Sequence, residues 1–158
     1  MRIGIIDVGS SSVRLLVVQV GKDGSMRSLA QGRRMTRLGD GIAVNGRLAD
    51  DAAAQSLEAI ESMAAQARQE GAEVVQAFAT AAVREAENGG EFATAVRERI
   101  GLELTILSGT EEARTAFAAV DAAMDLAGKD AVVFDLGGGS LQIIHSRRGV
   151  IVSSVSLK

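Results

Sequence analysis

The chain has 158 residues, 47% of them hydrophobic, so it is long enough to fold around a core and is not a disordered chain. Its net charge of −3 argues against non-specific binding of nucleic acid or of an anionic membrane. It has no cysteine, which excludes disulfides and thiolate zinc sites and fits a reducing compartment such as the cytoplasm. Asp7 and Arg14 interrupt the first apolar stretch, so we expect neither a signal peptide nor a membrane span there.

Apolar patterning predicts strands and helices in alternating groups. Three strands are expected first, at 2–7, 13–20 and 25–31, followed by a polar loop. An amphipathic helix is expected over 50–69, because Leu57, Ile60, Ala64 and Ala67 recur at helical spacing and Gly71 follows. The remaining pattern predicts a strand at 73–78, helical segments at 80–87 and 90–100, a strand at 102–106, a helix at 109–126, and strands at 131–135, 141–146 and 150–155.

An internal repeat is the main organising feature of the sequence. The segment DVGSSSVRLL at 7–16 returns as DLGGGSLQII at 135–144. In both copies an apolar strand ends in an aspartate, a Gly/Ser turn follows, and a second apolar strand begins. Each copy therefore predicts a tight hairpin with a glycine-rich turn.

Such a hairpin has the chemistry of a phosphate site. Glycines allow backbone N–H groups to converge on one point, and the aspartate at the strand end can hold a divalent cation. A single loop is equally consistent with a plain glycine-rich hairpin. Two loops with matching Asp, Gly and Ser positions favour the two halves of one clamp for a phosphate chain and its metal.

The segment SGTEEAR at 108–114 adds a candidate base. Ser108 and Glu111 have the spacing of a capping box at a helix start, which is the structural role we expect for Glu111. Glu112 lies about 100° further round the helix, where it can orient and deprotonate a water molecule. A favourable interaction with the helix dipole is the alternative role for Glu112.

Arginines in two segments could bind phosphate oxygens. Arg84 follows a buried strand in ATAAVREAENG, and Arg33, Arg34 and Arg37 lie in RRMTRLGDG. A surface ion pair is an equally open role for Arg84. We expect His145, the only histidine, to have a strand-surface role and not a catalytic one.

Five stretches, taken in order, resemble the exopolyphosphatase/guanosine pentaphosphate phosphohydrolase (Ppx/GppA) family. They are IDVGSSSVRLL, TRLGDGI, ATAAVREAENG, SGTEEAR and FDLGGGSLQ. The resemblance implies the actin, sugar-kinase and chaperone-ATPase superfamily. The implied fold class is α/β: a ribonuclease H-like (actin-like ATPase) domain with a mixed five-stranded sheet and flanking helices, plus the opening strands of a second such domain. The implied boundaries are 1–127 for the first domain and 128–158 for the start of the second.

The resemblance also implies residue roles. Glu112 would be the general base, Arg84 would contact phosphate, and Asp7 and Asp135 would lie near Mg2+ or another divalent cation. The two loops would bind phosphate through Gly9, Ser10, Ser12 and Arg14 and through Gly137, Gly138, Gly139 and Ser140.

Three departures from the family pattern bear on these roles. Ser11 stands where the family usually has Asn. Gln142 stands where the family usually has a Glu beside the metal, so it is a doubtful metal ligand because a neutral amide supplies no negative charge. The chain reads SVSLK where the family usually reads SLPLG and continues through a second domain. We therefore expect an apolar meander that is open unless it folds back on the first domain or pairs with a second chain, and a homodimer is the expected form.

The favoured function is hydrolysis of the terminal phosphate of inorganic polyphosphate or guanosine pentaphosphate by metal-assisted attack of water. The alternative is a non-catalytic module that binds phosphate or a nucleotide, favoured by Gln142 and by the incomplete second domain. An ATP-hydrolysing relative of the sugar kinases fits the loops but not the ordered set of motifs. No nucleic-acid or membrane partner is expected.

Overall fold

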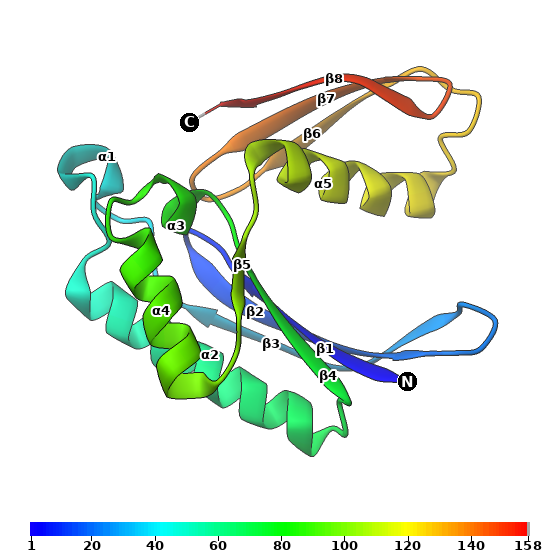
Figure 1. Cartoon of the computed structure of the whole chain (residues 1–158). Coiled ribbons are helices and arrows are strands. Elements are labelled where there is room, and N and C mark those ends of the chain that lie inside the picture. Colours follow the sequence, from blue (N-terminus) through cyan, green and yellow to red (C-terminus); the bar gives the residue numbers. More distant parts are fainter. Residues whose placement is uncertain (158) are drawn as a thin grey trace. The chain divides into compact units, whose positions relative to one another are not determined.

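The computed structural model describes residues 1–157, which form two compact units that divide between Ile106 and Leu107. No helix in this range is long and apolar enough to cross a membrane. The first unit contains β1 (Arg2–Val8), β2 (Ser12–Val20), β3 (Met26–Met35), α1 (Ile42–Asn45), α2 (Asp50–Gln69), β4 (Val74–Ala79), α3 (Ala81–Glu85), α4 (Gly89–Ile100) and β5 (Leu104–Ile106). The second contains α5 (Gly109–Met124), β6 (Ala131–Leu136), β7 (Leu141–Arg147) and β8 (Val150–Leu157) (Figure 1).

The first unit is built on a mixed sheet with strand order β3-β2-β1-β4-β5. Strands β1, β2 and β3 form an antiparallel meander, β4 pairs with β1 in parallel, and β5 pairs with β4 in parallel. Helices α2 and α4 pack together over one face of the sheet (Figure 1). Gly4 on β1 permits the close approach of α2, because a Cβ at this position would lie 2.7 Å from the Cβ of Ala67. The expected mixed five-stranded sheet with flanking helices is confirmed.

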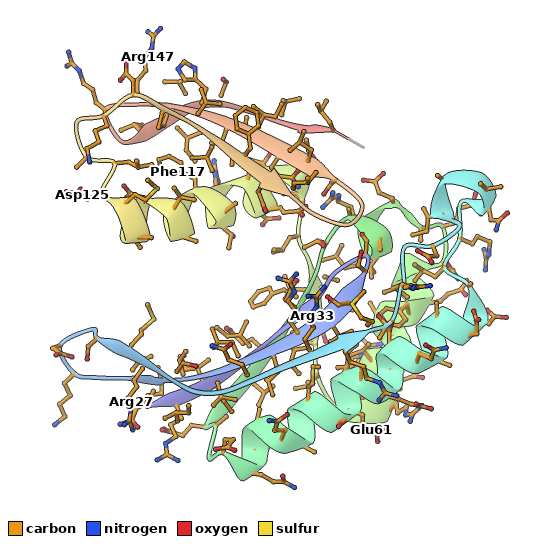
Figure 2. The ribbon with its side chains drawn as sticks, turned by 180° about the vertical axis from the view of Figure 1, so that it is seen from behind. Arg27, Arg33, Glu61, Phe117, Asp125 and Arg147 are labelled. Carbon is orange, nitrogen blue, oxygen red and sulfur yellow. The ribbon has the colours of Figure 1, made fainter. Side chains whose placement is uncertain are left out.

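The second unit is a three-stranded antiparallel sheet with one face covered by α5. Its buried apolar residues are Ala113, Phe117, Leu126, Val133 and Ile144. Figure 2 shows Phe117 on the side of α5 that faces the strands. Alternate residues point to the opposite face. This second face, which we call the outer face, includes Val132, Phe134 and Leu136 of β6, whose exposed fractions are 54%, 65% and 80%.

Most elements agree with the predicted ones, and the differences have local causes. Strand β3 continues beyond the predicted end at 31 because Met35 pairs with Ser12 of β2. Helix α5 ends at Met124, before the predicted 126, where Asp125 adopts a left-handed backbone with φ 48°. Strand β5 begins at Leu104 instead of 102, and the short helix α1 lies where the sequence predicts a loop.

The division into compact units differs from the predicted domain boundary. The units divide at 106/107 because α5 packs on β6, β7 and β8 and shares their apolar core. The sequence places the boundary at 127/128, after this helix. The apolar face of the meander is thus covered by α5, which lies within the segment 1–127 onto which the sequence analysis allowed the meander to fold back. The assignment of 1–127 to one family domain remains a prediction.

Candidate active site

The first glycine loop joins β1 to β2 in the first unit. The N–H of Gly9 donates to the carbonyl of Ser12 at 3.1 Å, which closes the turn. Asp7 on β1 lies opposite Arg14 on β2, and Asp7 is partly exposed. The side chains of Ser10 and Ser12 are largely buried, and the Ser12 hydroxyl accepts a hydrogen bond from Nε of Arg33 at 3.3 Å. The loop is therefore held by neighbouring strands and is not a free hairpin tip.

The segment 36–39, part of the TRLGDGI motif, fixes the backbone of this loop. The N–H groups of Thr36 and Arg37 both donate to the carbonyl of Ser11, at 3.2 and 3.0 Å, and the N–H of Gly39 donates to the carbonyl of Ser10 at 2.8 Å. Leu38, within this segment, is fully buried in the apolar core of the first unit. These contacts give the motif a structural function that the sequence analysis did not identify, namely to preorganise the first loop.

The second glycine loop, in the second unit, repeats the first at the level of the backbone. The N–H of Gly137 donates to the carbonyl of Ser140 at 2.9 Å, as Gly9 does to Ser12. Asp135 on β6 lies opposite Gln142 on β7, as Asp7 lies opposite Arg14. The expectation of two equivalent strand–turn–strand elements is therefore confirmed.

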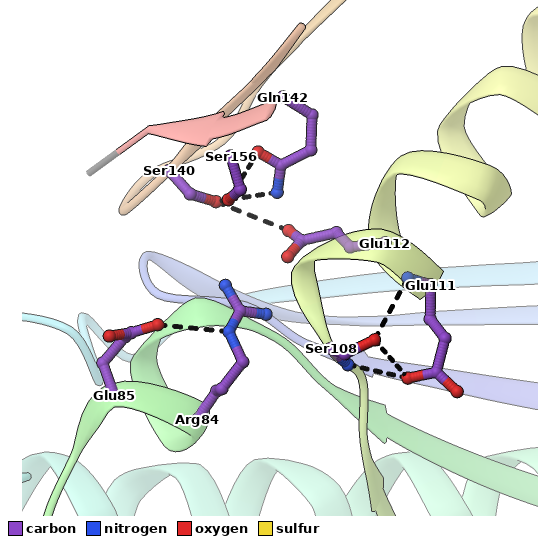
Figure 3. Close-up of polar contacts among 8 residues, drawn as sticks. All are labelled: Arg84, Glu85, Ser108, Glu111, Glu112, Ser140, Gln142 and Ser156. Carbon is purple, nitrogen blue, oxygen red and sulfur yellow. Dashed lines mark hydrogen bonds and ion pairs between the residues drawn. The ribbon is translucent and has the colours of Figure 1, made fainter. Parts of the chain in front are cut away.

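Glu111 and Glu112 at the start of α5 have different surroundings. The hydroxyl and N–H of Ser108 donate to Oε2 of Glu111 at 2.7 and 2.8 Å, and the N–H of Glu111 donates back to the Ser108 hydroxyl at 3.2 Å (Figure 3). This capping box is the predicted one, and the Ser108 hydrogen bonds lower the pKa of the Glu111 carboxyl. Glu112 is turned toward the second loop, where the Ser140 hydroxyl donates to its Oε1 at 3.5 Å.

Gln142 lies beside this contact and is 1% exposed. Its Nε2 donates to the Ser140 hydroxyl oxygen at 3.2 Å, and its Oε1 accepts from the Ser156 hydroxyl at 3.3 Å (Figure 3). The two serines come from the glycine loop and from β8. The second unit alone therefore brings together Glu112, Ser140, Gln142 and Ser156 in a connected set of hydrogen bonds.

Arg84 lies on α3, close in the fold to the end of β1. The N–H of Thr80, which precedes α3, donates to the carbonyl of Val8 at 3.4 Å, and β1 and β4 are parallel, so both strands end at the same edge of the sheet. Nε of Arg84 donates to Oε1 of the adjacent Glu85 at 3.2 Å, and the Arg84 side chain is 20% exposed. The ion pair considered as an alternative is present, and phosphate binding by Arg84 remains a prediction.

Within residues 1–157 no group of three or more His, Cys, Asp or Glu side chains could hold a metal ion by itself. Asp135 is exposed, on the same face of the sheet as Gln142, because directly opposed strand residues share a face. His145 lies on the opposite face of β7 from Gln142 and Ile144. It therefore points away from α5, in line with its expected strand-surface role.

Ser156 is the residue of this set that the sequence analysis did not identify. Its position follows from strand register, since Gln142 on β7 pairs with Ser156 on β8. Gly109 at the start of α5 lies against it, and a Cβ on Gly109 would be 3.1 Å from the Cβ of Ser156. The signal for it in the sequence would have been the register of β7 and β8, estimated from the turn at 148–149 that joins them.

Comparison with known proteins places this geometry in a family context. Residues 16–158 match the model of the Ppx/GppA phosphatase family. The chain is 34% identical over 143 residues to Exopolyphosphatase 1 of Mycobacterium tuberculosis, which covers 90% of this chain and 42% of that protein. It is 33% identical over 139 residues to the guanosine-5'-triphosphate,3'-diphosphate pyrophosphatase of Vibrio cholerae, which covers 88% of this chain and 28% of that protein.

The same family is found among solved structures. The crystal structure of the Aquifex aeolicus Ppx/GppA family member superposes on 99% of this chain and 51% of its own, with a TM-score of 0.85 and 32% sequence identity. The expected fold class is thereby confirmed. The chain spans about half the length of that structure and less than half the length of the two relatives named above. This chain belongs to the Ppx/GppA phosphatase family.

Proposed function

We propose that this chain provides the water-activating part of a phosphohydrolase that releases terminal phosphate from inorganic polyphosphate or guanosine pentaphosphate. The printed names of the relatives from M. tuberculosis and V. cholerae support these two substrate classes. The observation that carries the proposal is the hydrogen bond from Ser140 to Glu112. It ties the candidate base at the start of α5 to the second glycine loop, which is the candidate phosphate site.

The proposed reaction is in-line attack of water on the terminal phosphorus. Glu112 would orient the water and accept its proton, as a general base must lie within hydrogen-bonding reach of that proton. The glycine loops would bind the phosphate oxygens through backbone N–H groups, and Arg84 would stabilise the negative charge that spreads over the equatorial oxygens. The leaving group would be the shortened polyphosphate or the guanosine tetraphosphate.

The proposal includes a divalent cation such as Mg2+, whose preferred ligands are oxygens of carboxylates, water and phosphate. Mg2+ commonly uses one or two carboxylates together with water molecules and substrate phosphates, so it does not need the cluster of three acidic side chains that the described residues lack. Asp7 and Asp135, at equivalent places in the two loops, would hold it, and bound Mg2+ would neutralise charge on the phosphates. Gln142 remains a possible oxygen ligand, although its Oε1 already accepts from Ser156.

A non-catalytic phosphate-binding module is the second candidate function. The buried amide of Gln142 favours it, because a neutral side chain adds nothing to the charge available for a metal. In this case the loops would bind tripolyphosphate without turnover.

The proposal also includes a homodimer and a cytoplasmic location. The exposed apolar residues of the outer face support self-association, since an uncovered apolar sheet face is typical of an interaction surface. The absence of cysteine supports a reducing compartment.

The test is phosphate release from tripolyphosphate and from guanosine pentaphosphate, with Mg2+, by the chain and by Glu112→Gln. We expect the variant to lose at least about 100-fold in rate. Glu91→Gln is the matched control, because Glu91 also lies in the first turn of a helix. Within the described residues, its carboxylate forms a surface ion pair with Arg47. Glu91→Gln should leave the rate unchanged. Tripolyphosphate binding without any phosphate release would favour the binding module.

A further inference from the structure

The polar groups of Gln142 form the centre of a three-step hydrogen-bond chain. Ser156 donates to Oε1 of Gln142 at 3.3 Å, Nε2 of Gln142 donates to Ser140 at 3.2 Å, and Ser140 donates to Glu112 at 3.5 Å. This hydrogen-bond chain runs from Ser156 on β8 through Gln142 on β7 to Ser140 of the glycine loop, and it ends on the carboxylate of Glu112 on α5. Gln142 and Ser140 are 1% and 9% exposed, so water competes little for these bonds.

The Glu112 carboxylate determines which group donates and which accepts in each of these hydrogen bonds. An ionised Glu112 can only accept, so the single proton of the Ser140 hydroxyl must point toward Glu112. The Ser140 oxygen must then accept from Gln142, and only the NH2 group of the amide can donate. The amide oxygen is left facing Ser156, whose hydroxyl donates to it. The same reasoning places Nε2 of Gln142, and not Oε1, toward Ser140. With the amide flipped, the single proton of the Ser140 hydroxyl would face two acceptors, Oε1 of Gln142 and Oε1 of Glu112.

We propose that Gln142 is a positioning residue that directs the Ser140 proton onto Glu112 and so holds the candidate base in place beside the second glycine loop. A carboxylate at position 142 could only accept, and a chain of this direction could not form with it. The glutamine is therefore more than a neutral substitute at a metal site. The role of Gln142 in catalysis rests on the proposed function, whereas the direction of the hydrogen-bond chain does not.

The direction can be tested without activity, by NMR of the 15N-labelled full chain. The side-chain amide signals of Gln142 are identified by their loss in Gln142→Met. We expect Glu112→Ala to shift these signals and to speed their exchange with solvent severalfold, because the Ser140 proton then no longer has the carboxylate as its acceptor. Ser140→Ala should shift them as well. Ser146→Ala is the matched control, since Ser146 is a fully buried serine on the same strand whose hydroxyl donates to the carbonyl of Ala131.

The Gln142 signals should remain in place in the Ser146→Ala variant. Unmoved Gln142 signals in Glu112→Ala, with a native backbone spectrum, would overturn the directed chain, because a side chain that merely fills space at position 142 would not respond to the carboxylate.

The consequence for catalysis is tested by phosphate release from tripolyphosphate. Gln142→Met keeps the length and apolar volume of the side chain and removes both hydrogen bonds. We expect kcat to fall by roughly 3- to 10-fold with KM changed by less than about twofold, and little further fall when Gln142→Met is added to Ser140→Ala. Additive losses would overturn the positioning role. If the unmodified chain releases no phosphate, the proposed function fails, and the NMR experiment still decides whether the directed chain exists.

Discussion

Oε1 of Glu112 lies 3.5 Å from the hydroxyl oxygen of Ser140, although 28 residues separate them in the sequence. The contact depends on how α5 sits on the meander, because Glu112 is in the first turn of the helix and Ser140 precedes β7. Gly109 sets the spacing at this end of the helix, where it meets Ser156 of β8. The position of the candidate base is thus determined by packing between α5 and β8.

Gly109→Ala should therefore reduce activity while leaving the fold intact. The new Cβ would be 3.1 Å from the Cβ of Ser156, so the start of α5 must move by a few tenths of an ångström and stretch a hydrogen bond that is already long. We expect phosphate release to fall by about 3- to 10-fold. Gly90→Ala is the control, because Gly90 is also in the first turn of a helix but a Cβ there meets nothing within 4 Å. Equal rates in both variants would contradict the packing argument.

Asp7→Asn and Asp135→Asn should each weaken Mg2+-dependent binding of tripolyphosphate, measured by calorimetry. The two carboxylates occupy equivalent places in two loops with the same backbone closure, and asparagine keeps the shape while removing the charge. We expect at least about a 10-fold loss of affinity in each variant, corresponding to about 1.4 kcal/mol.

Asp23→Asn serves as the control, since Asp23 lies in the β2–β3 turn and bonds to Ser25. Affinity unchanged in both loop variants, with or without Mg2+, would contradict the proposal that both loops take part in binding phosphate and metal.

The sequence predicts the loops well and their partners poorly. The closures of Gly9 on Ser12 and of Gly137 on Ser140 are local, so the repeat and the turn chemistry are sufficient to predict them. The capping box of Ser108 and Glu111 is local for the same reason. The contact of Gln142 with Ser156 depends instead on strand register, which the bulge between His145 and Ser146 shifts by one residue.

Which sheet α5 covers could not be predicted, for a related reason. Helix α5 shows one apolar face in the sequence, with Ala113 and Phe117 at its centre, but periodicity does not say which sheet that face meets. The sequence analysis assigned the helix to the domain 1–127, and in the structure it packs on the strands that follow it. Only the three-dimensional contacts distinguish the two arrangements.

Gln142→Glu should destabilise the chain and make its stability depend on Mg2+. The side chain is 1% exposed, so a charge at this position is buried beside Asp135, which lies opposite it. We expect a loss of about 1–3 kcal/mol in the free energy of unfolding at neutral pH without metal, and partial recovery on addition of Mg2+. The measurement is urea unfolding at a series of Mg2+ concentrations. Stability of the variant that does not change with Mg2+ would argue against a metal near Asp135.

Ser108→Ala should lower the stability of the second unit in a way that depends on pH. Ser108 is the N-cap of α5, and loss of such a cap costs about 1 kcal/mol, or a few degrees in Tm. The Ser108 hydroxyl also lowers the pKa of Glu111, so this interaction stabilises the folded chain above the ordinary Glu111 pKa of 4.5 and is lost as the pH falls through the lowered value.

We therefore expect the Tm difference between Ser108→Ala and the unmodified chain, followed by circular dichroism, to be largest near neutral pH and to shrink below pH 4.5. Asp23 provides an internal comparison, because its pKa is lowered by Ser25 in a turn far along the chain from Ser108. Ser25→Ala should leave the helical circular dichroism signal unchanged, whereas Ser108→Ala, which removes the N-cap of α5, should reduce it. A Tm difference that stayed constant from pH 7 to pH 3 would contradict the role of the Glu111 carboxylate.

The outer face of the second sheet should cause the chain to self-associate. Register places apolar side chains in two rows across the three strands, Phe134–Ile143–Val155 and Leu136–Leu141–Leu157. Phe134 and Leu136 are 65% and 80% exposed in the single chain, and within the described residues β6 and β8 each pair on one side only. Apolar area of this kind is costly to leave in water, and a symmetric pair of chains covers it with the same patch from each partner.

Light scattering during size-exclusion chromatography measures the result directly. At high micromolar concentration we expect a species of twice the 16.4 kDa of the single chain. Phe134→Ser combined with Leu136→Ser should shift it to the monomer, because both changes remove apolar area from the outer face. Val44→Ser is the control, since Val44 is 87% exposed but lies on α1 in the first unit. A monomeric unmodified chain at that concentration would rule out the outer face as a dimer interface.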